Sequence, residues 1–229
     1  MDKALDMLRK GLAVLNIPSS GIILDQFELY IEEIQKWSQR YRLVSKVDAV
    51  TLVQNHILDS LTVVPEIEQK ASTTVLDIGS GAGFPGLCVK IALPDLEVTL
   101  LDSRQHRIEF LKAVIRSLGL KSCFSLEARL EEDLPLKLLH YEAHFDIILA
   151  RGFASIPDIV RLTSPLLNKN GRYILHRGNT VKKELSAAQE CIKSYGLNFC
   201  KLDESPFCSL ASNKQNRIRR KYIVTLNKI

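Results

Sequence analysis

The sequence lacks the features of several protein classes. No apolar run approaches the roughly 18–20 residues that span a bilayer. The first residues lack the basic-then-apolar order of a secretory signal peptide. The five cysteines form no CxxC pair, and their odd number and irregular spacing favour reduced thiols over disulfides or zinc. We therefore expect a cytoplasmic protein with no membrane partner and no metal.

The composition is that of a folded soluble protein. Hydrophobic residues make up 46% and charged residues 25% of the 229 positions, which excludes disorder, collagen-like repeats and a disulfide-stapled miniprotein. The length fits one large domain, or one domain with a small appendage.

Positive charge is confined to the C-terminal third of the chain. The net charge is −2 over residues 1–70, −3 over 71–150 and +10 over 151–229. Such polarity indicates a phosphate-rich partner on one side of the molecule, or else a solvated face. Charge alone leaves both readings open.

Apolar periodicity divides the chain into an N-terminal helical cap, residues 1–70, and a larger domain, residues 71–229. In the cap we expect helices over about 2–16 and about 27–37, and a third beginning at Asp48, a good N-cap.

The larger domain alternates short β-branched runs with helical segments, which predicts an α/β fold. We expect a mostly parallel seven-stranded sheet with helices on both faces. The expected strands are 74–78, 97–102, 123–126, 145–149, 171–175, 197–202 and 220–226, and the expected helices are 85–93, 108–118 and 180–194.

A glycine-rich loop follows the first strand, in the run VLDIGSGAGFPG over residues 75–86. Its last three glycines also satisfy GxGxxG, and Asp102 lies 21 residues beyond Gly81, where a carboxylate binds ribose hydroxyls. The pattern alone does not separate S-adenosylmethionine from NAD. Asp77 at the strand tip favours a cationic ligand, and Pro85 removes an N–H that a phosphate would use.

Several segments resemble one family in particular. They are NHILDSL at 55–61, FPG at 84–86, LDS at 101–103, RLEE at 129–132 and ARGFAS at 150–155. The loop resembles motif I of the class I S-adenosylmethionine-dependent methyltransferases. Together the segments resemble the ribosomal RNA small subunit methyltransferase G family, also called glucose-inhibited division protein B. The resemblance covers about residues 20–180 and implies a Rossmann-like fold.

The resemblance and the loop chemistry assign candidate residues. The cofactor-binding candidates are Asp77, Gly79, Gly81, Gly83, Phe84, Asp102, Leu130, Glu131 and Arg151. The RNA-binding candidates are His56, Arg177, Lys214, Arg217, Arg219 and Arg220. His56, Asp59 and Ser60 match a family motif that we place beside the site without a role.

The chain departs from the family pattern in three places. Arg42-Leu43-Val44 replaces the usual Asn-Leu-Thr, Gly152 replaces an alanine, and Arg177-Gly178 replaces Lys-Gly. These changes bear on the substrate side more than on the cofactor side. Arginine and lysine both keep a positive charge, but their donor geometries differ.

The resemblance implies transfer of a methyl group to N7 of a guanine in 16S ribosomal RNA, in the loop of the decoding region, on free rRNA or on the 30S subunit. The Asn/Asp-Pro-Pro-aromatic motif of amino methyltransferases is absent after the fourth strand, and no cysteine nucleophile lies near it. N7 carries no proton, so no acid or base is assigned. Arg151 would orient the base through O6 or pair with a carboxylate. The alternatives are an NAD-dependent oxidoreductase and a non-catalytic RNA-binding ribosome assembly factor.

Overall fold

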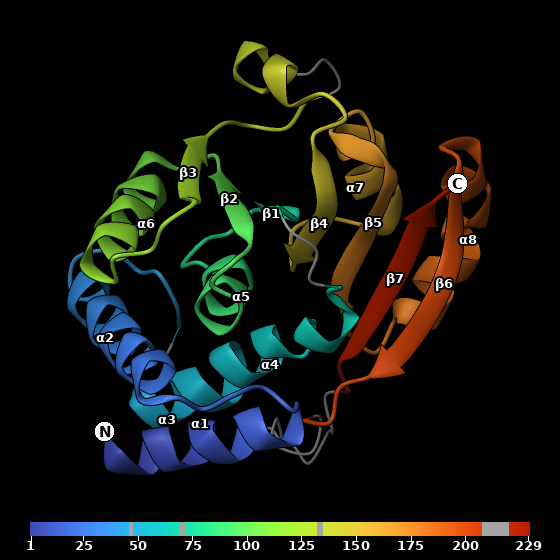
Figure 1. Ribbon diagram of the computed structural model, residues 1–229. Coiled ribbons are helices and arrows are strands. Elements are labelled where there is room, and N and C mark those ends of the chain that lie inside the picture. The colour runs from blue at the N-terminus through green and yellow to red at the C-terminus, as the bar shows by residue number, and fades with distance from the viewer. Residues whose placement is uncertain (46–47, 69–71, 132–134, 208–219) are drawn as a thin grey trace.

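A seven-stranded sheet in the order β3-β2-β1-β4-β5-β7-β6 forms the centre of the molecule (Figure 1). The computed structural model describes residues 1–45, 48–68, 72–131, 135–207 and 220–229. Among these residues, β7 is the one strand that runs antiparallel to its neighbours. The strands are β1 (Thr74–Ile78), β2 (Glu97–Asp102), β3 (Cys123–Glu127), β4 (Phe145–Arg151), β5 (Leu167–Arg177), β6 (Leu197–Glu204) and β7 (Tyr222–Lys228). The predicted Rossmann-like α/β fold is confirmed.

The helices follow the predicted positions with small shifts. They are α1 (Asp2–Val14), α2 (Gly21–Ser38), α3 (Ala49–Leu52), α4 (Leu58–Leu61), α5 (Gly86–Ala92), α6 (Gln105–Ser117), α7 (Ile156–Thr163) and α8 (Val181–Ser194). Short turns of other helix types are η1 (Val53–Ile57), η2 (Val64–Glu66) and η3 (Leu136–Tyr141). The Asp48 side chain caps α3 as predicted, accepting from Thr51 N at 2.8 Å.

Helix α7 and the early start of β5 were not predicted. Ser155 caps α7 by accepting from Asp158 N, and Pro157 occupies its first turn, where a missing N–H costs nothing. Strand β5 begins at Leu167 instead of residue 171 because it also pairs with the first residue of β4 across a register shift. The residues Asn168-Lys169-Asn170 are polar, so a search for apolar runs does not detect this part of the strand.

Side chains alternate between two cores, one on each face of the sheet. Val75 belongs to a large cluster shared with the N-terminal helices, α5 and α6, whereas Leu76 belongs to a smaller cluster under α7 and α8. This alternation is the two-residue period of a strand buried on both faces. Because β1, β2, β4 and β5 run parallel to one another, their carboxyl ends meet at one edge of the sheet, between the two helical layers (Figure 1).

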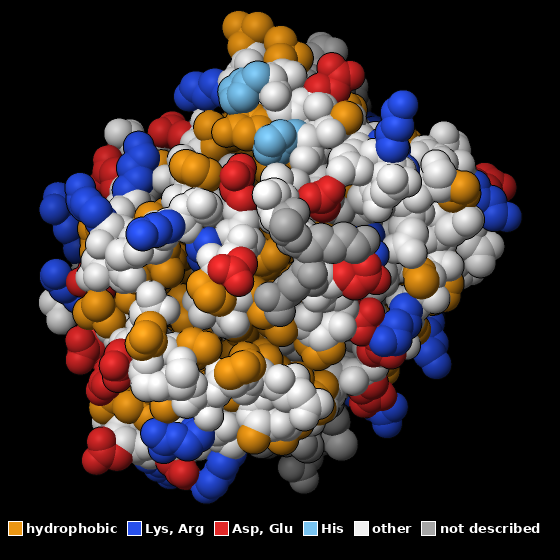
Figure 2. All heavy atoms as spheres, in the orientation of Figure 1, with side chains coloured by type: hydrophobic (Ala, Val, Ile, Leu, Met, Phe, Trp, Pro, Cys, Tyr) orange, Lys and Arg blue, Asp and Glu red, His pale blue; other side chains and the backbone are white. Residues whose placement is uncertain are grey.

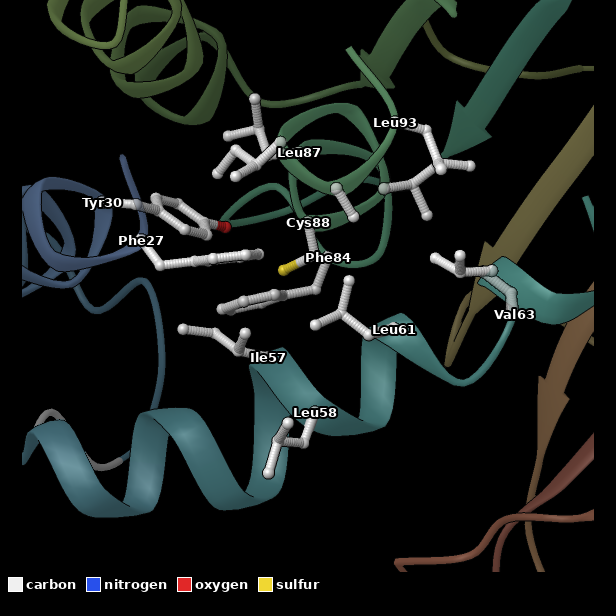
Figure 3. Close-up of a cluster of buried hydrophobic side chains, with 14 of the residues drawn as sticks. Phe27, Tyr30, Ile57, Leu58, Leu61, Val63, Phe84, Leu87, Cys88 and Leu93 are labelled. Atoms are coloured by element: carbon white, nitrogen blue, oxygen red, sulfur yellow. The ribbon is translucent and has the colours of Figure 1, made fainter. Parts of the chain in front are cut away.

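The N-terminal helices pack directly on α5 (Figure 3). Phe27 and Tyr30 from α2 and Ile57 from η1 surround Phe84, which begins the turn into α5. The Tyr30 hydroxyl donates to the carbonyl of Ala82 in the glycine loop. One apolar cluster thus ties the cap to the loop. The predicted boundary at residue 70 lies outside the described residues, so the division into two domains stays a prediction.

A short segment projects beyond the end of the sheet between β3 and β4. Its turn η3 exposes 85% of Leu136 and 50% of Leu139. Figure 2 shows hydrophobic side chains gathered over this segment, at the top of the view. Among the described residues, no helix has the length and apolar character of a membrane span.

Candidate functional site

The glycine loop between β1 and α5 turns at left-handed backbone angles. Gly79 has a φ of +68° and Gly83 a φ of +92°, which side chains other than glycine rarely adopt. A Cβ on Gly83 would lie 2.4 Å from Leu87 Cδ1 and 2.8 Å from the Tyr30 hydroxyl, and one on Gly79 would lie 2.5 Å from the Phe153 ring. The backbone angles and the neighbouring side chains together therefore limit these two positions to glycine.

Asp102 at the end of β2 holds this loop in place. Its Oδ2 accepts from Gly81 N at 2.9 Å and from Arg107 Nη1 at 3.0 Å, and its Oδ1 accepts from Arg104 N at 3.0 Å. The side chain is 3% exposed. An ionised carboxylate has about four acceptor sites. Two backbone donors fix the carboxylate, and a ribose would use the remaining site and the one shared with Arg107.

A cavity of about 700 Å³ opens beside Asp102, within the roughly 300–1,000 Å³ typical of small-molecule sites. We call it the first cavity. Its wall includes Gly79, Asp102, Arg107, Leu130, Gly152 and Phe153. Three predicted cofactor residues, namely Gly79, Asp102 and Leu130, thus share one wall. Glu131 is exposed and lines a neighbouring hollow with Leu136.

Asp77 lies beneath the loop and is fully buried. Its Oδ2 accepts from Gly86 N at 3.0 Å, and no hydrogen-bond partner for its Oδ1 occurs among the described residues. Burial raises the pKa of this carboxyl to about 7, against the lowering effect of the Gly86 and Ser80 hydrogen bonds. Asp77 is not in the wall of the first cavity, so its contact with a cofactor stays a prediction; the acidic Asp102 and the apolar Leu130 of that wall fit S-adenosylmethionine.

Phe84 does not line the first cavity. It packs between cap and sheet, with its ring centroid 5.1 Å from that of His56 and 5.7 Å from that of Tyr30. His56 is half-buried on η1, and burial together with nearby Arg151 lowers its pKa to about 4. Contact of Phe84 with cofactor and of His56 with RNA stay predictions, whereas the structure assigns both side chains to the cap junction.

Arg151 at the end of β4 pairs with a buried carboxylate from the cap. Its Nη2 lies 2.9 Å from Asp59 Oδ2 and 2.8 Å from the Asn55 carbonyl oxygen. Lys221, just before β7, places its Nζ 3.1 Å from Asp59 Oδ1. Burial would raise the pKa of Asp59, but Arg151, His176 and Lys221 together hold it below its ordinary value. The structure shows the carboxylate pair, and orientation of the base by Arg151 stays a prediction.

A second cavity of about 450 Å³ borders the first, and Gly152 lies in the walls of both. We call it the second cavity. Asp59, Arg151, His176, Arg177, Glu184 and Lys221 are among its lining residues. The second cavity thus brings together charged groups at the carboxyl ends of β4 and β5 and in the first turns of α8 with Asp59 and Lys221. In the sequence, these groups are spread over more than 160 positions.

The predicted RNA-binding residues are scattered. Arg177 is 9% exposed at the end of β5, with its Nε 3.4 Å from Glu184 Oε1. Arg220 is exposed and its Nη1 lies 3.6 Å from Glu204 Oε2. Lys214, Arg217 and Arg219 lie outside the described residues.

The lining residues that sequence reasoning missed include Arg107 in the first cavity and His176 and Glu184 in the second. Phe153, which lines the first cavity, was noted only as part of the segment at 150–155. His176 directly precedes the noted Arg177, so the end of the β5 run was the available signal. Glu184 gave none, because one acid on an amphipathic helix resembles any solvated position.

Comparison with known proteins points to one family. The family model "GidB: rRNA small subunit methyltransferase G" matches residues 23–205. A protein named Ribosomal RNA small subunit methyltransferase G from Lachnoclostridium phytofermentans is 34% identical over 91% of this chain and 84% of its own length. A protein of the same name from Halalkalibacterium halodurans is 35% identical over 76% of this chain and 72% of its own length.

Solved structures share the fold at low identity. A SAM-dependent methyltransferase from Aquifex aeolicus has a TM-score of 0.57 and 15% identity, covering 78% of this chain and 93% of that one. A geranyl diphosphate C-methyltransferase from Streptomyces coelicolor has a TM-score of 0.59 and 13% identity, covering 93% of this chain and all of that one.

Proposed function

Because this chain belongs to the rRNA small subunit methyltransferase G family, we propose that it transfers a methyl group from S-adenosylmethionine to N7 of a guanine in 16S ribosomal RNA. The match to the family model over residues 23–205 carries the proposal, since it includes every segment around the first cavity. The protein's partner would be free 16S rRNA or the 30S subunit, in the cytoplasm.

The first cavity supplies what the cofactor needs from the chain. S-adenosylmethionine, when bound, provides a methyl group on a positively charged sulfur. Asp102 would hold the ribose hydroxyls, and the free Oδ1 of Asp77 would face positive charge. Leu130 offers an apolar wall for an adenine. The second cavity adjoins at Gly152, so an RNA base and the cofactor can meet there.

The chemistry requires no proton transfer from the protein before attack. The N7 lone pair lies in the plane of the guanine and carries no proton at neutral pH. The half-buried His56 and the buried His176 have pKa values near 4, because burial disfavours their charged forms. Both rings are therefore neutral at neutral pH. Alignment of two bound partners can itself lower a barrier by roughly 7–11 kcal/mol. The chain's task is therefore to orient the base and exclude water.

The proposal is tested by locating methylated guanines in 16S rRNA from cells with and without the gene. We expect one N7-methylguanine to disappear on deletion and to return when purified protein and S-adenosylmethionine are added to the 30S subunits. Calorimetry should show binding of S-adenosylhomocysteine and none of NADH. An unchanged methylation map, with RNA binding intact, would favour the assembly-factor alternative and overturn the proposal.

A further inference from the structure

The residues that line the second cavity carry more positive than negative charge. The charged side chains among them are the cations Arg151, Arg177 and Lys221 and the carboxylates Asp59 and Glu184. Burial lowers the pKa of the lining His176 to about 4, so its ring adds no charge at neutral pH. Three cations against two carboxylates leave an excess of one positive charge, which attracts an anion.

The excess charge is located around Asp59. Arg177 and Glu184 form a pair with one charge of each sign, and 3.4 Å separates Nε of the first from Oε1 of the second. Asp59 instead contacts two cations, since its Oδ2 lies 2.9 Å from Arg151 Nη2 and its Oδ1 lies 3.1 Å from Lys221 Nζ. One carboxylate balances one of these two cations, so the lining residues leave the other positive charge uncompensated.

Both of these cations are more exposed than the carboxylate between them. The side chains of Arg151 and Lys221 are 20% and 21% exposed, whereas that of Asp59 is 3% exposed. Arg151 also retains donors, because its contacts with Asp59, Asn55 and Ser60 use three of the five N–H groups of a guanidinium. A ligand that enters the second cavity can therefore contact the cations while Asp59 stays in place.

The spacing of the two cations suits a phosphodiester. A phosphodiester carries one negative charge shared by two unesterified oxygens, as a carboxylate does. Donors that meet both oxygens of Asp59 are therefore close enough to meet both oxygens of one phosphodiester. We propose that Arg151 and Lys221 bind, in the second cavity, one phosphodiester of the rRNA next to the target guanine, and that Asp59 positions both cations. The assignment rests on the proposed function and adds to it where the protein holds the RNA backbone.

The cofactor carries another anion, the carboxylate of its methionine end. That end also carries an ammonium group, so its two charges cancel and it does not match a cavity with an excess of positive charge. Asp102, which would hold the cofactor's ribose, lines the first cavity. RNA carries one negative charge per nucleotide and so supplies the anion that the second cavity lacks. The charge balance therefore favours the RNA backbone over the cofactor.

The test removes one charge from the RNA and one from the protein. Small subunits are assembled on 16S rRNA in which a neutral methylphosphonate replaces, one at a time, the phosphodiesters on either side of the methylated guanine. Binding is measured with the protein loaded with S-adenosylhomocysteine. We expect one replacement to weaken binding by the wild type about tenfold. Lys221→Met should weaken binding of unmodified subunits about tenfold, and the same replacement should then cost less than a further twofold, because groups in contact do not act additively.

Lys193→Met serves as the matched control, because Lys193 is exposed in the last turn of α8. It should lose the full tenfold on the replacement that affects the wild type. Affinity for S-adenosylhomocysteine should stay within twofold in both variants, which also verifies folding. Should Lys221→Met fail to fold, Lys221→Gln takes its place, since an amide can still donate to Asp59.

Three results would overturn the assignment, and each has a different meaning. If neither replacement weakened binding by the wild type, or if its effect and that of Lys221→Met were additive, the cations would not hold a phosphodiester, while the methyltransferase activity would stand. If Lys221→Met weakened binding of S-adenosylhomocysteine but not of its decarboxylated analogue, the cations would hold the cofactor's carboxylate. Absence of methyl transfer by the wild type would refute the proposed function and the assignment together.

Discussion

The two halves of the sheet edge differ in the charged side chains that end their strands. At the ends of β1 and β2 the side chains are carboxylates, Asp77 and Asp102, whereas around β4, β5 and β7 they are the cations Arg151, Arg177 and Lys221. The same division is visible in the sequence, where residues 71–150 carry a net −3 and residues 151–229 a net +10. One edge is thus suited to a cationic cofactor next to a polyanionic substrate.

The buried acids of the two halves also titrate in opposite directions. Cations surround Asp59 and lower its pKa, whereas Asp77 has a raised pKa because burial dominates. The first acid stabilises the fold when ionised, and the second destabilises it. Changing each acid to its amide therefore tests whether the two acids affect the free energy of unfolding in opposite directions.

The largest effect is expected for Asp59→Asn. Removing one partner of a buried ion pair costs about 3–5 kcal/mol, and we expect about 3 kcal/mol because Arg151 and Lys221 reach solvent. The pKa of Asp59 is depressed, so its stabilisation is present at neutral pH and is lost as pH falls below its ordinary value near 4. Urea unfolding of both proteins at pH 7 and at pH 3.5 measures the difference.

Asp6→Asn is the control, because Asp6 and Lys10 form an exposed pair at 2.7 Å that is worth less than about 1 kcal/mol. If Asp59→Asn proved no more costly than Asp6→Asn, the cation half would not depend on its buried carboxylate.

The second change, Asp77→Asn, should stabilise the protein at neutral pH. A pKa raised from 3.8 to about 7 corresponds to roughly 4 kcal/mol of penalty on the ionised form. The new amide donors of the asparagine offset part of this gain, so we expect the free energy of unfolding to rise by about 1–3 kcal/mol at pH 8. Because the folded-state pKa is raised, the penalty grows from pH 4 to pH 7 and is absent below. Unfolding curves across this range should converge toward pH 4.

The same variant should bind S-adenosylhomocysteine, which carries an ammonium group, about tenfold more weakly by calorimetry. A variant that gained stability and kept its affinity would remove Asp77 from the cofactor site.

The third change, Asp102→Ala, should weaken cofactor binding by about 10- to 100-fold while the domain stays folded. The carboxylate anchors the loop through Gly81 N and offers charge-assisted bonds to a ribose, each worth about 1.5–3 kcal/mol. Calorimetry with S-adenosylhomocysteine measures the loss, and circular dichroism monitors the fold. Asp95→Ala, at an exposed carboxylate before β2, is the control. Equal affinities in the two variants would contradict the assignment.

How much was predictable differs between the halves. The acid half is local: β1, its glycines and Asp102 lie within 30 residues, so spacing alone identified the loop and its carboxylates. The cation half brings residue 59 of the cap to residues 151 and 221, and only tertiary packing makes these meet. The resemblance assigned Phe84 to the cofactor, which stays a prediction, and only tertiary packing shows that its ring lies against His56 and Tyr30.

The smallest effect is expected at the basic segment before β7. Reversing Arg219 and Arg220 to glutamate should weaken binding to 30S subunits several-fold at low salt. Each lost phosphate contact should flatten the log-affinity against log-salt slope by roughly 0.7–0.9. Affinity for S-adenosylhomocysteine should not change, since Arg220 is not among the described residues that line the first cavity. Arg220 lies next to Lys221, which contacts Asp59, so an RNA held here would sit against the cation half.

Reversal of Arg9 and Lys10, which are exposed on α1, makes the same change in charge and is the control. If both double variants flattened the slope equally, binding would depend on net charge and not on this segment. An unchanged slope for the Arg219 and Arg220 pair would mean that these arginines are solvated surface. The phosphate contacts would then be sought at Arg40, Arg42 and Lys46, which follow α2 in the sequence, or at Arg177.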